Sequence, residues 1–218
     1  MSLYLKGVSV GYKSASLVSS IDAELNSGDF ICLIGRNGTG KSTLLRTIAG
    51  LISPISGTVE CPDSIGIVLT QVPDLRNTTV FELVSYGRIP HQNILANLRQ
   101  DDIEAIEHAI ETVGIINLRD RKICELSDGE KQKAMIARAL AQGTDILLLD
   151  EPSAFLDYES KHELMQLLRV LAHERGKAVL LSSHDIDLVR IYADKVWQVI
   201  DGRLRVLPKV GNEIVGLR

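Results

Sequence analysis

The sequence has 218 residues, of which 45% are hydrophobic, 24% are charged and only 4% are aromatic. This length suits a single domain whose core is built mainly from Leu, Ile, Val and Ala. The formal net charge of −4, without any basic run, disfavours a groove for nucleic acid. No apolar run approaches the roughly 18 residues that a membrane span needs, and the N-terminus lacks a secretory pattern, so we expect any membrane role to come through a partner.

In chain order, hydrophobic periodicity predicts strands and helices that alternate over most of the sequence. The predicted strands cover residues 3–10, 17–25, 30–35, 57–60, 65–69, 145–150 and 177–183, and a closing hairpin covers 195–207. The predicted helices begin at Lys41 and behind residue 130, and the others cover 79–87, 101–113, 159–175 and 185–193. Strands that alternate with helices indicate an α/β fold with a mainly parallel sheet. The first two strands are expected to be antiparallel, and the helix-rich stretch from about 72 to 142 is expected to be an inserted subdomain.

A glycine-rich stretch, GRNGTGKST at 35–43, follows an apolar strand and opens a predicted helix. It fits the phosphate-loop pattern G-x-x-x-x-G-K-[ST] at every fixed position. In this pattern backbone N–H groups point at phosphate oxygens, the lysine reaches the β and γ phosphates, and the serine hydroxyl binds Mg²⁺. The predicted site for a nucleoside triphosphate and Mg²⁺ consists of Gly35, Arg36, Asn37, Gly38, Thr39, Gly40, Lys41, Ser42 and Thr43. A chance glycine-rich turn is the alternative, and the strand–loop–helix context argues against it.

Polar side chains follow three other predicted strands. Asp150 ends the strand DILLLD and is expected to hold Mg²⁺, while Glu151 is expected to act as general base toward an attacking water. His184, in SSHD, is expected at the same edge of the sheet, where it can polarise that water. Gln71 follows SIGIVLT, and its amide can contact both Mg²⁺ and the water. The alternative for Asp150 and Glu151 is a pair of capping carboxylates. The alternative for His184 is a structural histidine, and that for Gln71 is a polar loop residue.

The stretch LSDGE at 126–130 stands before the apolar-periodic stretch KQKAMIARALAQ, which predicts a helix. Ser, Asp and Gly are ordinary helix-starting residues, so a cap is the simplest interpretation. A helix N-terminus is also a phosphate site, because its free N–H groups and its dipole favour anions. The residues alone leave both interpretations open.

Together and in this order, the motifs resemble those of the ATP-binding subunits of ABC transporters over nearly the whole chain. Gln71 resembles the Q-loop, LSDGE the signature LSGGQ, DILLLDE the Walker B segment, and His184 the switch histidine. The resemblance implies an ATPase that uses ATP and Mg²⁺. It also implies a single ABC ATP-binding domain over residues 1–218, with the fold of a P-loop NTPase, an N-terminal antiparallel β subdomain and the helical insertion at about 72–142.

Two further residues take their roles from the resemblance alone. AFLD at 154–157 resembles the D-loop, with Asp157 as its acidic residue. Tyr12 resembles the aromatic residue that stacks on adenine, a contact of about 1 kcal/mol by analogy with aromatic pairs. The alternative for Tyr12 is a tyrosine that packs on its own strand pair.

In this family two subunits meet head to tail, and each signature closes over the ATP held by the partner's phosphate loop. The resemblance therefore implies a second ATP-binding subunit, most simply an identical copy. The residues that would face its γ-phosphate are Ser127, Asp128, Gly129 and Glu130. Asp128 and Glu130 depart from LSGGQ and add negative charge beside a phosphate. We expect both acids to turn outward to solvent or to Lys131 and Lys133, so that the site closes normally.

The segment TTVFELVSYGRIPHQ at 78–92 lies where such subunits contact a polytopic membrane permease, through a region of about 72–92. Within it, YGRIPH resembles the ATPases that import iron–siderophore complexes, haem and vitamin B12, as do SDGE and PSAFLD; a surface helix ended by proline is the alternative. The resemblance implies an energy-coupling subunit of such an importer, peripheral to the cytoplasmic face of the inner membrane. Two other classes compete: a soluble ABC protein, which usually has two cassettes or a long coiled coil, and a non-hydrolysing module, which would lack Glu151 or His184.

Overall fold

The computed structural model describes residues 2–12, 15–61, 64–70, 75–88, 98–210 and 213–216. Within these residues the strands form a seven-stranded sheet of order β10-β9-β8-β3-β7-β6-β5 and a three-stranded sheet of order β2-β1-β4. The strands are β1 (Ser2–Tyr12), β2 (Ala15–Asn26), β3 (Phe30–Ile34), β4 (Ser56–Glu60), β5 (Ile65–Val68), β6 (Ile146–Leu149), β7 (Ala178–Ser182), β8 (Lys195–Ile200), β9 (Arg203–Val210) and β10 (Glu213–Ile214). The helices are α1 (Lys41–Ile48), α2 (Val80–Ser85), α3 (Gln100–Thr112), α4 (Asp128–Ala141), α5 (Tyr158–His173) and α6 (Ile186–Tyr192), with short 3₁₀ turns η1 (Ile116–Leu118) and η2 (Ile123–Glu125).

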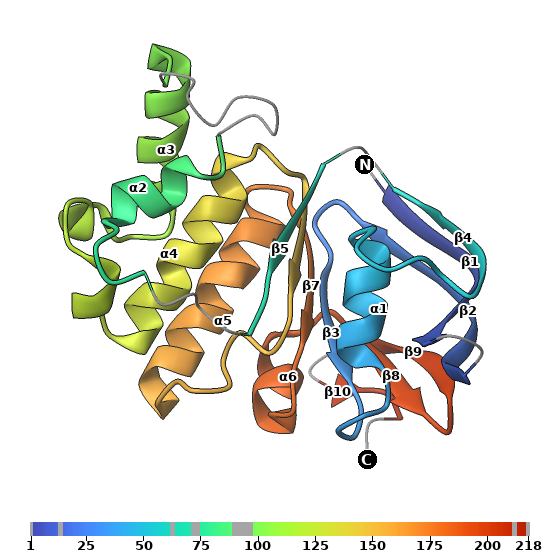
Figure 1. The fold of residues 1–218 in the computed structure, drawn as a ribbon. Coiled ribbons are helices and arrows are strands. Elements are labelled where there is room, and N and C mark those ends of the chain that lie inside the picture. Colours follow the sequence, from blue (N-terminus) through green and yellow to red (C-terminus); the bar gives the residue numbers. More distant parts are fainter. Residues whose placement is uncertain are drawn as a thin grey trace.

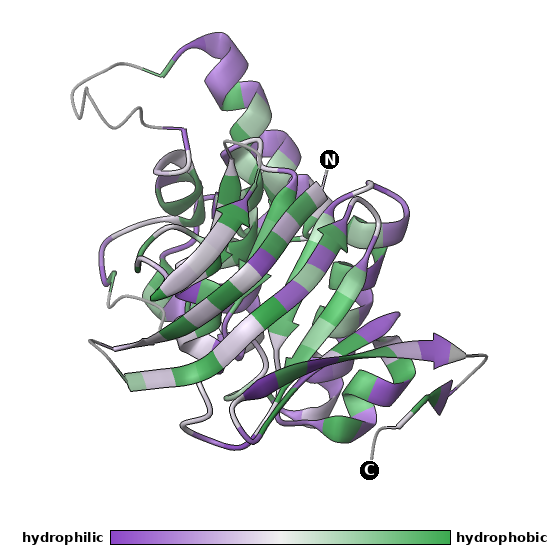
Figure 2. Ribbon diagram, turned by 90° about the vertical axis from the view of Figure 1, so that its right-hand side faces the viewer, coloured by the Kyte–Doolittle hydropathy of each residue, from purple (hydrophilic) through white to green (hydrophobic). Residues whose placement is uncertain are grey.

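The centre of the larger sheet is parallel and buried. β3 pairs in parallel with β7 and β8, β6 pairs in parallel with β5 and β7, and β9 returns antiparallel to β8. Successive side chains of β3 alternate between two hydrophobic clusters, with Phe30 and Cys32 in one and Ile31 and Leu33 in the other. Every residue of β3, β6 and β7 is buried, as expected for a parallel sheet that is covered on both faces. In Figure 2 the three-stranded sheet faces the viewer, and hydrophobic and hydrophilic residues mix along its strands.

Helices cover the two faces of this sheet (Figure 1). α1 lies between the parallel strands and the three-stranded sheet, and its Leu44 and Leu45 belong to the cluster that joins them. On the opposite face α4, α5 and α6 contribute Met135, Leu168 and Val189 to the other cluster. No helix in the described part of the chain is long and apolar enough to cross a membrane. The layers leave the carboxyl ends of the parallel strands to the loops that carry the predicted site, the usual place for ligands in such folds.

The mainly parallel α/β fold and the separate N-terminal antiparallel sheet are confirmed. The predicted hairpin turn is present, with φ of 48° at Asp201 and 68° at Gly202, which suits the left-handed turn that Asp-Gly favours. The sequence did not predict β10, whose two residues pair with β9, because so short a strand carries no periodic signal. α2, α3 and α4 lie between β5 and β6, where the helical insertion is expected; its role as a distinct subdomain stays a prediction.

Candidate functional site

The phosphate loop connects β3 to α1 and contains glycines in conformations that other residues rarely adopt. Gly38 has a φ of 78° and Gly40 a φ of 103°, both in the left-handed region. A Cβ on Gly40 would also lie 3.0 Å from the Cβ of Leu17. Gly40 is the N-cap of α1, and it makes no side-chain capping bond. The first N–H groups of α1 are therefore available to phosphate oxygens.

The side chain of Lys41 is only 5% exposed and folds back over this loop. Its Nζ donates to the carbonyl oxygen of Gly35 at 2.9 Å and to that of Arg36 at 3.4 Å. Burial lowers the pKa of Lys41, and the nearby carboxylates of Glu151 and Asp150 oppose that effect. A partly desolvated ammonium held by two carbonyls has much to gain from an anionic partner such as a phosphate.

Asp150 follows β6 and faces the first turn of α1. Its Oδ1 accepts hydrogen bonds from Ser42 Oγ at 3.0 Å and from Ser182 Oγ at 2.8 Å, and its carbonyl oxygen accepts one from Thr70 Oγ1 at 2.8 Å. A hydroxyl beside a carboxylate is the kind of oxygen donor set that Mg²⁺ prefers. Among the residues that the structure describes, no three His, Cys, Asp or Glu side chains gather to hold a metal. Mg²⁺ usually takes one or two protein ligands and completes its shell with phosphates and water.

Glu151 is held in an unusual conformation beside His184. Its φ is 50°, which is uncommon for a residue other than glycine. Such a conformation costs free energy, and residues that adopt it are often found at functional sites. Its N–H donates to Ser182 Oγ at 2.8 Å, and its Oε1 lies 2.5 Å from His184 Nε2. Lys41 Nζ lies 3.3 Å from the same Nε2. Because Nε2 carries either one proton or one lone pair, these two histidine contacts are alternatives.

The structure thus brings together five predicted side chains from three segments of the chain: the start of α1, the end of β6 and the end of β7. We call them the catalytic group: Lys41, Ser42, Asp150, Glu151 and His184. Tyr12 lies beside this group, since its OH accepts a hydrogen bond from Thr43 Oγ1 at 3.4 Å while its ring stays half exposed. Gln71, the remaining predicted catalytic residue, lies outside the described residues.

The signature residues begin α4 and bond to one another. Ser127 Oγ accepts the N–H of Glu130 at 3.3 Å, and Glu130 Oε2 accepts the Ser127 N–H at 2.8 Å and the Ser127 Oγ–H at 3.0 Å. The Ser127 N–H, with the hydroxyl, holds the pKa of Glu130 below its ordinary value. Asp128 forms an ion pair with Lys131 at 3.0 Å. The expectation that both acids turn outward is therefore right for Asp128 and wrong for Glu130, because the capping box offers Glu130 two donors in place of Lys133.

Asp157, which is predicted to belong to the D-loop, lies next to the signature residues. It caps α5, accepting the N–H of Ser160 at 2.8 Å and its Oγ–H at 3.0 Å, and these bonds lower the pKa of Asp157. We call the following residues the signature group: Ser127, Asp128, Gly129, Glu130 and Asp157. Four of them, with Phe155 and others, line a hollow of about 480 Å³. Among the described residues, no hydrogen bond or ion pair joins this group to the catalytic group.

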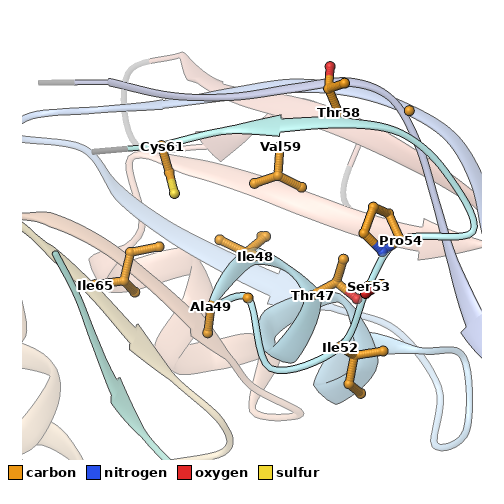
Figure 3. Close-up of a pocket in the computed structure, with 12 residues that line it drawn as sticks. Thr47, Ile48, Ala49, Ile52, Ser53, Pro54, Thr58, Val59, Cys61 and Ile65 are labelled. Carbon is orange, nitrogen blue, oxygen red and sulfur yellow. The ribbon is translucent and has the colours of Figure 1, made fainter. Parts of the chain in front are cut away.

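A larger hollow, of about 600 Å³, lies between the C-terminal end of α1 and β4 (Figure 3). Its lining includes Ile48, Val59, Cys61 and Ile65, and it includes none of the predicted site residues. The phosphate loop stands at the other end of α1. The larger of the two hollows is therefore not the predicted nucleotide site.

Ser182 is the residue of the site that sequence reasoning missed. It is fully buried at the end of β7, and its hydroxyl bonds to both Asp150 and Glu151. The available signal was a serine closing the apolar run KAVLLS, where a polar side chain has to find a partner. The sequence gives no signal for the left-handed conformation of Glu151, because glutamate is not a residue type that favours this region.

Comparison with known proteins places these motifs in a family. A family model described as ABC transporter matches residues 18–154. An uncharacterised ABC transporter ATP-binding protein of Methanocaldococcus jannaschii, MJ0873, is 40% identical over 207 residues, which is 89% of this chain and 71% of that protein. The ferric enterobactin transport ATP-binding protein FepC of Escherichia coli is 35% identical over 90% of this chain and 78% of its own length. A cobalamin import ATP-binding protein, BtuD of Halobacterium salinarum, is 34% identical over 94% of this chain and 54% of its own length.

Solved structures agree with that relationship. A chain from a transporter described as metal-chelate type, in an inward-facing conformation, superposes with a TM-score of 0.88 at 29% identity, covering 95% of this chain and 83% of that one. The ABC transporter cassette MJ0796, solved as a dimer, superposes with a TM-score of 0.79 at 25% identity, covering 96% of this chain and 99% of that one.

Proposed function

Since the chain belongs to the ABC transporter family, we propose that it is the ATP-hydrolysing subunit of an importer for an iron chelate or a cobalamin-type compound. The observation that carries the proposal is the catalytic group. A phosphate loop, a hydroxyl–carboxylate pair and a carboxylate–imidazole pair meet at one edge of the sheet. This is the set of side chains that hydrolysis of a bound nucleotide requires.

ATP would bind with its phosphates over the N-terminus of α1. Backbone N–H groups and Lys41 would contact the phosphates, and the exposed ring of Tyr12 is free to stack on the base. Ser42 and Asp150 would hold Mg²⁺, with Gln71 as a further ligand. The metal would neutralise charge that develops on the phosphates.

Hydrolysis needs a group that accepts a proton from the attacking water. Glu151 is suited to this role, because its carboxylate stands at the open edge of the sheet and its backbone is fixed by Ser182. In the proposed step the water oxygen bonds to the γ-phosphorus, its proton passes to Glu151, and the bond to ADP breaks. His184 would move from its contact with Glu151 to donate to the γ-phosphate and to hold the water in line.

The signature group would complete the ATP site of a second copy of the chain. Within the described part of one chain no hydrogen bond or ion pair joins the two groups, which fits this arrangement, and exposed apolar side chains beside the signature also support it. Phe155 is 75% exposed and Tyr158 is 78% exposed, and side chains of this size are enriched where proteins associate. ATP held between two copies would favour the dimer by mass action, and hydrolysis would release it.

The permease would contact the region of about 72–92. Tyr86 is half exposed at the end of α2, and Arg88 is fixed by an ion pair with Asp102 at 2.9 Å. Pro90 and His91 lie outside the described residues. A subunit bound in this way would be peripheral to the cytoplasmic face of the inner membrane. FepC and BtuD, whose names specify ferric enterobactin and cobalamin, support the proposed class of cargo.

The test is an affinity purification of tagged Glu151→Gln protein from its own cells, in mild detergent with ATP, read by mass spectrometry. We expect a stoichiometric polytopic membrane protein, whose identity would narrow the cargo. The Lys41→Met protein, which cannot hold ATP firmly, serves as the matched control for ATP-dependent association. A soluble dimer alone, or co-purified ribosomes or DNA-repair factors, would instead support a soluble ABC ATPase.

A further inference from the structure

The side chain of Glu130 holds the only hydroxyl proton of the signature serine. Glu130 Oε2 accepts hydrogen bonds from the Ser127 N–H at 2.8 Å and from the Ser127 Oγ–H at 3.0 Å. A serine hydroxyl has one proton to donate. While this bond exists, Ser127 Oγ can offer another anion its lone pairs and no hydrogen bond.

In the proposed function, Ser127 has to donate that proton to the γ-phosphate of the ATP bound by a second copy. The carboxylate of Glu130 and the phosphate would then both lie within hydrogen-bond distance of one hydroxyl. Two anions that share a single donor compete for it, and they also repel one another at this separation.

The charges around Glu130 do not remove the conflict. Asp128 is paired with Lys131 at 3.0 Å and Glu163 with Lys133 at 2.8 Å. Among the described residues, Glu130 itself has no cation within ion-pair distance. Its pKa lies below the ordinary value because the Ser127 N–H, foremost, stabilises the carboxylate, so Glu130 is ionised at neutral pH.

From this geometry we propose that Glu130 competes with the partner's γ-phosphate for the Ser127 hydroxyl proton and so raises the ATP concentration needed for dimer closure. The inference rests on the proposed head-to-tail ATP site. Glu130 is here a residue that sets the ATP dependence of closure, and it takes no part in the hydrolytic step. A glutamine at this position would fill the same capping box without a charge. Its neutral amide oxygen accepts the Ser127 hydroxyl proton more weakly than a carboxylate does, so the phosphate would compete for that proton more successfully.

The chain contains a matched control in the capping box at the start of α2. Glu82 Oε2 accepts the N–H of Thr79 at 2.8 Å, and Thr79 Oγ1 accepts the N–H of Glu82 at 3.2 Å. Thr79 is the N-cap of α2 and Glu82 lies in its first turn. Neither belongs to the catalytic or the signature group, and the isolated chain used in the test carries no permease to contact the region of about 72–92. Glu82→Gln therefore makes the same chemical change in the same motif, away from any phosphate.

The experiment measures ATP-driven dimerisation of the isolated chain by analytical ultracentrifugation, in the Glu151→Gln background, which stops turnover. We expect Glu130→Gln to lower the ATP concentration at half-dimerisation by about three- to tenfold, because the phosphate gains the Ser127 hydroxyl proton and, to a smaller extent, because a nearby like charge is removed. Glu82→Gln is expected to leave this midpoint within twofold. Because glutamine preserves the capping box, both variants are expected to melt close to the parent.

A third comparison separates the shared proton from simple repulsion. In a Ser127→Ala background the hydroxyl is gone, so the effect of Glu130→Gln is expected to shrink to less than half. An effect of full size in that background, or a Glu130→Gln midpoint equal to the parent's, would overturn the inference. If the Glu151→Gln parent itself stays monomeric at every ATP concentration, the proposed function fails and the inference fails with it.

Discussion

The catalytic group and the signature group are held in place by different kinds of contact. Asp150 and Glu151 are fixed by Ser182, more than thirty residues away in sequence, and by side chains from α1 and from His184. Ser127 and Asp157 instead take their partners three residues along the same helix. The first group includes the buried Lys41 and Asp150 and depends on the packed sheet, whereas the second has no buried member and depends on local capping. We therefore expect substitutions in the first group to affect chemistry strongly, and those in the second to affect closure or local stability.

The largest expected effect comes from Glu151→Gln. The variant keeps the size of the side chain and loses the oxygen that accepts a proton, so kcat should fall by about 10²- to 10⁴-fold. Nucleotide binding should persist, because the phosphate loop is untouched, and ATP should trap a dimer. The measurement is steady-state phosphate release together with binding of a fluorescent ATP analogue. Near-normal turnover would remove Glu151 as the base.

Lys41→Met should have the next largest effect. Unlike Glu151→Gln it should impair ATP binding, and it should not destabilise the nucleotide-free protein. Loss of the ammonium should weaken ATP hydrolysis by about 10²- to 10³-fold, as expected when a preorganised group that stabilises phosphate charge is removed. The nucleotide-free protein should melt no lower than the parent, because burial lowers the Lys41 pKa and the charged side chain therefore disfavours folding. This contribution is present below the lowered pKa and fades as pH rises toward 10.5, the ordinary value.

Calorimetry with and without ATP checks both halves of this prediction. ATP should raise the melting temperature of the parent and leave that of Lys41→Met unchanged. Unaltered ATP affinity and hydrolysis rate in the variant would defeat the phosphate-loop assignment.

Ser182→Ala tests whether the strained backbone of Glu151 matters for the reaction. The change leaves the Glu151 N–H without its partner and removes one donor from Asp150, so we expect kcat to fall about tenfold, with a smaller change in KM. Thr144→Val is the control, since Thr144 is also a buried hydroxyl and donates to Ala139 O at 3.3 Å at the far edge of the sheet. If both variants lose the same activity, the loss reflects general destabilisation, and Ser182 does not act by positioning Glu151.

The same contrast explains how much the sequence could predict. Continuous apolar strands such as FICLI and ILLL, and the local signals of the phosphate loop and the LSDGE cap, predict the fold and most of the site. The roles of Ser182 and of the Glu151 conformation arise only when β6 and β7 pair, which no local pattern encodes. Glu130 was misjudged for a different reason. The expectation gives Glu130 solvent or Lys133 as its partner, whereas the capping-box pattern S-x-x-E that begins at Ser127 predicts the serine.

The smallest expected effect is that of Asp157→Ala, and it tests the local character of the signature group. Removing the cap of α5 should lower the melting temperature at pH 7 by about 2–4 °C.

The size of this effect should depend on pH. Ser160 holds the folded-state pKa of Asp157 below its ordinary value of 3.8. A carboxyl group with a lowered pKa stabilises the fold above the ordinary value, and that contribution is lost as pH falls through the folded-state value. The difference between the parent and the variant should therefore be constant above about pH 5 and disappear under strong acid. Asp120→Ala, which removes a highly exposed acid paired with Arg119, should change the melting temperature little at any pH. A difference for Asp157→Ala that persists unchanged at low pH would mean that the side chain acts through packing, and the signature group would then be less local than its hydrogen bonds indicate.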